Sequence, residues 1–183
     1  MDDEQAVRRL KRGQMDGLEY LVSRYQVKAW HVAFLVTRDE ALAQDVVQET
    51  FIRIYQRIRQ FDAARPFEPY LMRSVVNAAL NALRGGGKSL SLEGDPARFE
   101  NLLAHAASVE TEVEFAQAQA EIFSALAQLS PRQRAVIVQR YYLDMSEKEM
   151  AESLAAAPGT IKWLLNAARA RLRALLRSER NAE

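Results

Sequence analysis

Basic side chains without acidic neighbours mark the last third of the sequence. Between Ser153 and Ser178 there is no Asp or Glu, and the cations are Lys162, Arg169, Arg171, Arg173 and Arg177. At roughly 100° per helical residue, most of them fall with Asn166 on the side opposite an apolar stripe. That stripe contains Ile161, Leu164, Leu165, Ala168, Leu172, Leu175 and Leu176. Guanidinium, ammonium and amide groups bind phosphates and base edges, so the pattern predicts a helix with one core face and one DNA-binding face.

Two capped helices come before this basic helix. Ser130-Pro131-Arg-Gln133 and Ser146-Glu-Lys-Glu149 each place a serine cap three residues before Gln or Glu, which is typical of a helix start. A break at residues 155–159 leads into the basic helix, which we expect over 160–177. Two short helices with a tight break, the second one basic, predict a helix-turn-helix. The alternative is a solvated basic face on a helix that only packs, and the capped helices favour DNA binding.

Basic and aromatic side chains also interleave earlier in the chain, at Arg57, Arg59, Phe61, Arg65, Phe67, Tyr70 and Arg73. Cations bind phosphates and aromatic rings stack on exposed bases, so this combination suits single-stranded nucleic acid. The alternative is that the aromatic rings belong to the core, which we expect for Phe61. The following helix carries Arg73, Asn77, Asn81 and Arg84 at spacings of 4, 4 and 3. These four residues, here called the Arg-Asn stripe, line one side of the helix and favour nucleic-acid contact.

The predicted helix over residues 39–60 has two different faces. Its apolar arc holds Val46, Val47, Thr50, Phe51, Ile54 and Ile58. Its outer arc mixes acid, amide and base around one apolar residue, at Asp45, Gln48, Glu49, Ile52, Arg53 and Gln56. Such a mixture suits docking to a partner with mixed charges. A solvated face with one stray apolar residue fits equally well.

The whole sequence is expected to be helical, because Gly and Pro number only 7 and 5 among 183 residues and no stretch alternates with period two. Further helices are expected over residues 3–12, 14–36, 68–84 and 112–128, and Thr37 is expected to begin the capping box of the 39–60 helix. We predict an all-α fold of two small helical domains, residues 1–84 and 112–183. Residues 85–111 mix Gly, Ser, Pro and acids, and we predict a flexible linker there.

The composition excludes several classes of protein. The net charge is only +1, with mildly basic ends and an acidic middle, so nucleic-acid affinity must come from local patches. Without cysteine there is no disulfide and no thiolate metal site. His31 and His105 are isolated, and His31 is expected to pack in an apolar run. With no cluster of nucleophile, base or metal ligands we predict no enzyme, no catalytic residue, no metal and no cofactor.

A membrane location is not expected. Uncharged runs are far shorter than the roughly 20 residues needed to span a bilayer. The N-terminus is acidic and then basic, without the apolar segment of a signal peptide. We therefore predict a cytoplasmic protein with no membrane insertion.

In this order and at this length, the motifs resemble those of the bacterial extracytoplasmic-function (ECF) sigma factors, group 4 of the sigma-70 family. Residues 39–51 resemble the helix that binds the clamp helices of RNA polymerase. Phe67-Glu-Pro-Tyr70-Leu71, followed by Asn77 and Asn81, resembles the segment that melts and reads the −10 element. The C-terminal motifs resemble sigma region 4, which reads the −35 element, and they are Ala125-Leu126, Leu129–Arg134, Tyr142–Ala151 and Gly159–Lys162.

The resemblance implies an alternative sigma factor that binds core RNA polymerase through the β′ clamp helices and the β flap and directs initiation at specific promoters. The implied polymerase contacts are Asp45, Gln48, Glu49, Ile52 and Arg53. The implied −10 contacts are Arg65, Phe67, Tyr70, Arg73, Asn77, Asn81 and Arg84. The implied −35 contacts are Thr160, Lys162, Trp163, Asn166, Arg169 and Arg173. It also implies control by an anti-sigma factor, which the exposed apolar residues Ile52 and Trp163 would suit.

Three departures from the family pattern stand out. Tyr70 replaces the usual Trp, and Ala155 stands where a Gly often makes the turn. Trp163, Leu164 and Ala167 replace the Ser and Arg residues that usually follow this Lys. Fewer cations predict weaker phosphate contact and a shallower salt dependence.

Two other classes of protein stay open from the sequence. One is a helix-turn-helix repressor or activator that binds duplex DNA without polymerase. The other is a helical adaptor whose basic face binds protein. Against both stand the Arg-Asn stripe and the two-faced helix over residues 39–60, and nothing in the sequence resembles a sensor or dimerisation domain.

Overall fold

The computed structural model describes residues 1–85 and 121–180, and throughout these ranges the secondary structure is helical, with no strand. This confirms the all-α prediction. The helices are α1 (Asp3–Lys11), α2 (Asp16–Thr37), α3 (Glu40–Arg57), α4 (Phe67–Gly85), α7 (Pro131–Ile137), α8 (Glu147–Ser153) and α9 (Pro158–Arg180). A 3₁₀ turn at Ile58–Gln60 follows α3, a π-helical turn at Val138–Tyr142 follows α7, and residues 121–127 are helical.

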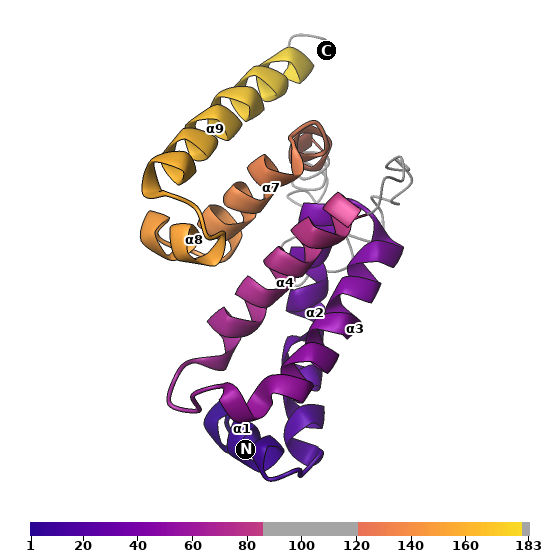
Figure 1. The fold of residues 1–183 in the computed structure, drawn as a ribbon. Coiled ribbons are helices and arrows are strands. Elements are labelled where there is room, and N and C mark those ends of the chain that lie inside the picture. Colours follow the sequence, from indigo (N-terminus) through magenta and orange to yellow (C-terminus); the bar gives the residue numbers. More distant parts are fainter. Residues whose placement is uncertain (86–120, 181–183) are drawn as a thin grey trace, which may run out of the picture.

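Helices α2, α3 and α4 run alongside one another, and α1 packs across the end where α2 begins (Figure 1). The apolar arc predicted on α3 faces their shared core, since Val46, Val47, Thr50, Phe51, Ile54 and Ile58 are all buried. The core is completed from α2 by Leu21 and Val32 and from α4 by Leu71, Val75 and Val76. The helical spacing of the apolar residues in α3 therefore determines which side of the helix is buried. We call α1–α4 the N-terminal module.

Helices α7, α8 and α9 form a second group, the C-terminal module. Both predicted capping boxes are confirmed: the Ser130 and Ser146 side chains each accept from the backbone N–H three residues on, and Gln133 and Glu149 reach back to the cap. The expected apolar stripe of α9 is buried at Ile161, Leu164, Leu165 and Ala168 and half-buried at Leu172, Leu175 and Leu176. Helix α9 begins at Pro158 and ends at Arg180, so it is longer than the predicted 160–177.

The start of α3 differs from the prediction. Thr37 is not a helix cap but the buried last residue of α2, and its hydroxyl bonds to the backbone of Asp39. The cap is Asp39, whose carboxylate accepts from the Leu42 backbone N–H at 2.9 Å. Arg38, at φ 63°, ends α2 in the left-handed region. Asp39, which also belongs to the expected Thr37–Glu40 motif, therefore caps α3 in place of Thr37, because the chain turns sharply at Arg38.

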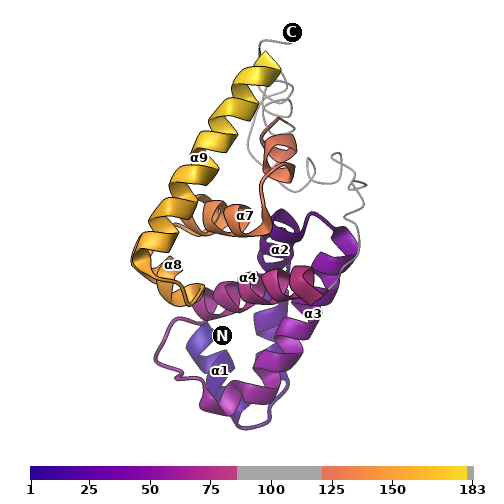
Figure 2. The same cartoon turned by 45° about the horizontal axis from the view of Figure 1, so that its top comes forward.

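The two modules pack directly against each other, with α7 against α2 and α4 (Figure 2). Arg134 of α7 is 1% exposed. Its Nε donates to the Val36 carbonyl and its Nη1 to the Leu129 carbonyl, each at 2.8 Å. Beside it the Arg38 guanidinium stacks on the Phe123 ring, 3.1 Å from its centroid. The predicted linker lies outside the described residues apart from Gly85, which ends α4.

Helices α1 and α2 approach each other closely at Gly17, because a Cβ placed there would lie 2.3 Å from the Ala6 carbonyl oxygen. We expect Gly17→Ala to lower the free energy of unfolding by about 1–3 kcal/mol, the usual cost of overpacking a core. Gly85→Ala is the control, since nothing lies within 4 Å of its Cβ position, and it should change stability by less than about 0.5 kcal/mol. Urea denaturation followed by circular dichroism compares them, and equal midpoints would contradict the close approach.

Candidate nucleic-acid interface

The Arg-Asn stripe lies on the side of α4 that faces α8. The Arg73 Nη2 donates to the Glu152 carbonyl at 2.5 Å, and the Asn77 Nδ2 donates to the Ser153 carbonyl at 2.9 Å. Asn81 and Arg84 continue the line and border a hollow of about 300 Å³ whose other wall includes Leu154, Ala155, Ala156 and Thr160. The four residues thus share one side, as predicted. In this conformation that side meets the C-terminal module.

A cavity of about 1190 Å³ opens between the loop before α4 and the start of α8. Four of the predicted −10 residues line it together, namely Arg65, Phe67, Tyr70 and Arg73. Sequence reasoning missed Arg24, Tyr25 and Lys28, which α2 adds to the same wall. The i, i+4 spacing of Arg24 and Lys28 on one helix face was the available signal. Cations and aromatic rings around one opening suit a nucleotide with its base unstacked.

The aromatic residues of this cavity divide into core and surface. Phe61 is 8% exposed, as expected for a core residue, and its ring centroid lies 4.6 Å from that of Tyr70. Phe67 is only 2% exposed and packs between Tyr25 and Phe61. The expectation that Phe67 faces DNA therefore does not fit this conformation, in which its ring supports the cavity wall. Tyr70 is half-buried and presents the more accessible ring.

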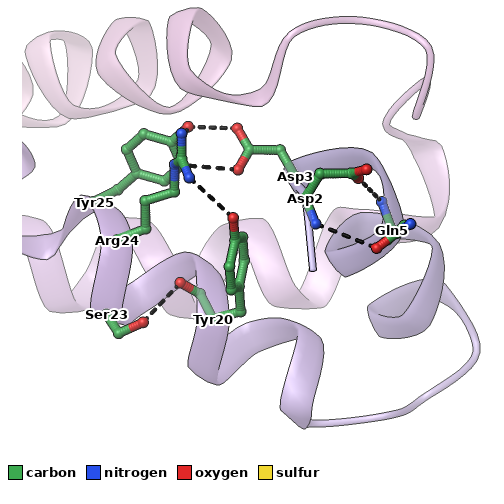
Figure 3. Close-up of polar contacts among 7 residues, drawn as sticks. All are labelled: Asp2, Asp3, Gln5, Tyr20, Ser23, Arg24 and Tyr25. Atoms are coloured by element: carbon green, nitrogen blue, oxygen red, sulfur yellow. Dashed lines mark hydrogen bonds and ion pairs between the residues drawn. The ribbon is translucent and has the colours of Figure 1, made fainter.

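A polar network fastens α1 to the cavity wall (Figure 3). The Tyr25 hydroxyl donates to the Asp3 carboxylate, and the Arg24 Nε lies 3.5 Å from the same group. Arg24 also donates to the hydroxyls of Tyr25 and Tyr20, at 3.2 and 3.0 Å. Burial, followed by the Asp3 hydrogen bond, raises the pKa of Tyr25 to about 12. Arg24 is thereby held at the cavity mouth by three neighbouring side chains.

The outer arc of α3 is exposed, as predicted, at Asp45, Gln48, Glu49, Ile52, Arg53 and Gln56. Glu49 forms an ion pair with Arg53 one turn later. Beside this face a groove of about 760 Å³ runs between α2 and α3. Its walls include Val27, Ile52 and Tyr55, which are 51%, 50% and 41% exposed. Of these, sequence reasoning identified only Ile52, because the groove needs two helices to form.

The polar side of α9 is open to solvent. Thr160, Lys162, Asn166 and Arg173 are exposed, and Trp163 points outward at 66% exposure. Arg169 is half-buried: its Nε donates to the Tyr141 hydroxyl at 2.7 Å and its guanidinium lies 5.7 Å from that ring. Because the Arg169 Nε is used in this hydrogen bond, the two terminal nitrogens of its guanidinium are the groups that can reach a phosphate. Tyr141, on the π-helical turn, was not identified from sequence.

The turn before α9 contains a strained residue. Ala155 has φ 47°, in the left-handed region that costs an L-residue roughly 1–2 kcal/mol. The turn therefore keeps a conformation suited to glycine although the residue has a Cβ. Within residues 1–85 and 121–180, no group of His, Asp or Glu could hold a metal ion. No helix among the described residues is long and apolar enough to cross a membrane.

Comparison with known proteins gives matches over both modules. Residues 21–89 match the family Sigma-70 region 2, and residues 119–172 match Sigma-70, region 4. The chain is 34% identical over 164 residues to the ECF RNA polymerase sigma factor SigL of Mycobacterium tuberculosis, covering 85% of this chain and 86% of that protein. It is 29% identical over 177 residues to the ECF RNA polymerase sigma factor SigW of Bacillus subtilis, covering 93% and 95%.

Two solved structures share the fold. CnrH in complex with the cytosolic domain of CnrY is 26% identical, with a TM-score of 0.65, covering 96% of this chain and 97% of that one. The sigma factor RpoE in complex with the anti-sigma factor NepR from Bartonella quintana has the same TM-score at 21% identity, covering 87% and 96%.

The raised pKa of Tyr25 predicts a pH dependence of stability. Because the folded pKa of about 12 lies above the ordinary value of 10, the neutral phenol stabilises the fold fully below pH 10 and loses this effect as the pH rises towards 12. The difference in the free energy of unfolding between the native chain and Tyr25→Phe should therefore become smaller above pH 10. Denaturant midpoints of both proteins from pH 8 to 12 measure it, and a constant difference would contradict the prediction.

Proposed function

The chain belongs to the ECF RNA polymerase sigma factors of the sigma-70 family, and from this premise we propose that it binds core RNA polymerase and directs initiation at promoters with −35 and −10 elements. The observation that carries the proposal is the exposed, mixed-charge face of α3 beside an apolar groove. A regulator that binds duplex DNA alone would not require such a face. Its role places the protein in the cytoplasm, where the polymerase works, and requires no catalytic residue.

The α3 face is the proposed polymerase contact. Asp45, Gln48, Glu49, Ile52 and Arg53 offer acid, amide and base around one apolar residue, which fits the β′ clamp helices of the enzyme. The neighbouring groove adds exposed apolar surface from Val27 and Tyr55. Apolar anchors surrounded by complementary charges are typical of interfaces with a few dominant contacts. The C-terminal module would contact the β flap.

The cavity and the Arg-Asn stripe are the proposed −10 site. Cations at Arg65, Arg73 and Arg84 would hold the phosphates of the non-template strand, and Asn77 and Asn81 would bond to its base edges. Tyr70 would stack on an unpaired base, supported from behind by Phe61 and Phe67. A base held in this way cannot re-pair, which stabilises the melted duplex.

The exposed side of α9 is the proposed −35 site. Thr160, Lys162, Trp163, Asn166, Arg169 and Arg173 would enter the major groove, with Trp163 against a thymine methyl or a sugar. Residues 1–84 and 112–183 would act as two weak DNA-reading domains, with residues 85–111 as their linker. Holding both on one polymerase raises the effective concentration of each at the promoter.

Control by an anti-sigma factor completes the proposal. Two structurally similar proteins were solved in complexes, one with an anti-sigma factor and one with the cytosolic domain of CnrY. The exposed apolar side chains of Ile52 and Trp163, at 50% and 66%, would serve such a partner.

Reversing the charge of the α3 face tests the polymerase contact. We expect Asp45→Arg with Glu49→Arg to weaken binding to core RNA polymerase at least tenfold, or about 1.4 kcal/mol, through lost pairs and like-charge contact. Glu4→Arg with Glu19→Arg is the matched control, because it makes the same charge change at exposed sites of α1 and α2. Binding is measured by fluorescence anisotropy of labelled protein, and equal affinities of the two variants would refute the docking assignment.

A charge added at Trp163 tests the −35 site. Trp163→Arg should bind −35 duplex DNA with a salt dependence steeper by about one ion, since each new phosphate contact changes the slope by roughly 0.9. Met15→Arg adds the same charge at an exposed site of the N-terminal module and should leave the slope unchanged. If titrations at several salt concentrations give the same slope for both variants, this face of α9 does not meet DNA.

A further inference from the structure

We propose that Arg24 of α2 is a further contact for the phosphate backbone of the melted strand, and that Tyr20, Tyr25 and Asp3 hold its guanidinium in place for this role. The inference rests on the proposed function, because it concerns the strand whose bases the proposed −10 residues bind. None of those residues comes from α2. A contact at Arg24 would add affinity for the melted strand without reading its sequence, since every nucleotide carries the same phosphate.

Three side chains fix the orientation of the Arg24 guanidinium (Figure 3). Its Nε donates to the Tyr25 hydroxyl at 3.2 Å, and its Nη1 donates to the Tyr20 hydroxyl at 3.0 Å. The Asp3 Oδ1 lies 3.5 Å from the Nε and completes the arrangement with an ion pair. A guanidinium has five N–H donors, two of them on Nη2. Among the described residues neither Nη2 donor has an acceptor, so both are available to a phosphate.

The cation is more accessible than the groups that hold it. The Arg24 side chain is 56% exposed, whereas that of Asp3 is 28% exposed and Tyr25 is buried. The Asp3 carboxylate is also largely occupied, because its Oδ1 is buried and its Oδ2 accepts from the Tyr25 hydroxyl. An approaching strand therefore meets the guanidinium of Arg24 before it meets the acid behind it.

A row of aromatic rings connects Arg24 to the proposed −10 residues. The Tyr25 ring packs against Phe67 with 5.9 Å between centroids, and Phe67 packs against Tyr70 with 6.4 Å between centroids. Arg24 and Tyr70 both line the large cavity of about 1190 Å³. Sites for single strands combine rings that stack on bases with cations that follow the backbone. A strand with one base stacked on Tyr70 would therefore bring a neighbouring phosphate to Arg24.

The other cation that α2 contributes to the cavity is less suited to this role. Lys28 lies one turn after Arg24, but its ammonium forms an ion pair with Glu68 of α4 and its side chain is 39% exposed. An ammonium is also a point charge, whereas the planar guanidinium of Arg24 can bond to two groups and still present a third nitrogen. Arg24 is therefore the better placed of the two to bind a phosphate.

Helix α1 takes part in this arrangement although it precedes the family match. The match to Sigma-70 region 2 begins at residue 21, so two of the three residues that hold Arg24 lie before it, namely Asp3 and Tyr20. Asp3 is the first residue of α1, and Tyr20 stands one turn before Arg24 on α2. The packing of α1 across α2 thus has a consequence for the cavity, because it supplies the acid that attracts Arg24 to its mouth.

Two substitutions at Arg24 test the phosphate contact in the complex with core polymerase. Arg24→Gln removes the charge, and we expect it to weaken binding of a single-stranded −10 oligonucleotide roughly fivefold. The salt dependence should become shallower by about 0.7, the change for one phosphate on a single strand. Arg24→Lys keeps the charge and should keep the native slope. Anisotropy of the labelled oligonucleotide at several salt concentrations measures both quantities.

Arg8→Gln is the matched control, because Arg8 is an exposed arginine of α1 that also pairs with an acid but lies outside the cavity. It should change neither the affinity nor the slope. If Arg24 only ties α1 to α2, both Arg24 variants would lower the urea midpoint while Arg24→Gln and Arg8→Gln gave equal slopes. That result would overturn the inference.

Tyr20→Phe tests whether the hydroxyl acts through Arg24. It removes the acceptor of the Arg24 Nη1 and changes no charge. We expect about two- to threefold weaker oligonucleotide binding in the native chain and no further loss in the Arg24→Gln chain, as for two residues that act together. An equal loss in both chains would contradict the positioning role of Tyr20.

The outcomes separate this inference from the proposed function. Binding to core polymerase is measured first for the native chain and each variant, and none of the substitutions alters the α3 face. Failure of the native chain to bind core polymerase would overturn the proposed function. Normal binding of polymerase and oligonucleotide by the native chain, with equal affinities and slopes for Arg24→Gln and Arg8→Gln, would overturn only the role of Arg24.

Discussion

The arrangement of the two modules depends on the buried guanidinium of Arg134. It bonds to one carbonyl at the end of α2 and to one just before α7, each at 2.8 Å. Carbonyls at a helix end lack intrahelical partners, and the negative end of the helix dipole favours a cation there. This bond fixes α7 at one end of the N-terminal module. Helix α8 consequently lies beside α4, where its last carbonyls meet Arg73 and Asn77.

The candidate binding surfaces differ in whether they take part in this packing. The α3 face and its groove stay exposed, whereas Arg73 and Asn77 of the Arg-Asn stripe donate to main-chain carbonyls of the C-terminal module. The interface also buries Arg38 and Arg134, three of whose guanidinium nitrogens have no hydrogen-bond partner among the described residues, and unpaired buried donors raise the free energy of this packing.

Short sequence patterns correctly predicted the features that depend only on interactions between residues close in the sequence. The serine caps at Ser130 and Ser146 and the buried arc of α3 follow from short-range hydrogen bonding and helical period, and the structure confirms them. Features that need distant segments were not predictable. The burial of Phe67 depends on Tyr25 from α2, and the groove beside Ile52 depends on Val27. The cap at Asp39 instead of Thr37 reflects how α2 ends, which the capping motif alone does not specify.

Transcription in vitro tests the central claim most directly. The purified chain is added to bacterial core RNA polymerase on a promoter library, and the 5′ ends of the transcripts are sequenced. The account predicts start sites that appear only with this chain and share upstream −35 and −10 motifs. The absence of new start sites, together with no binding to core polymerase, would contradict it and favour a regulator that binds duplex DNA alone.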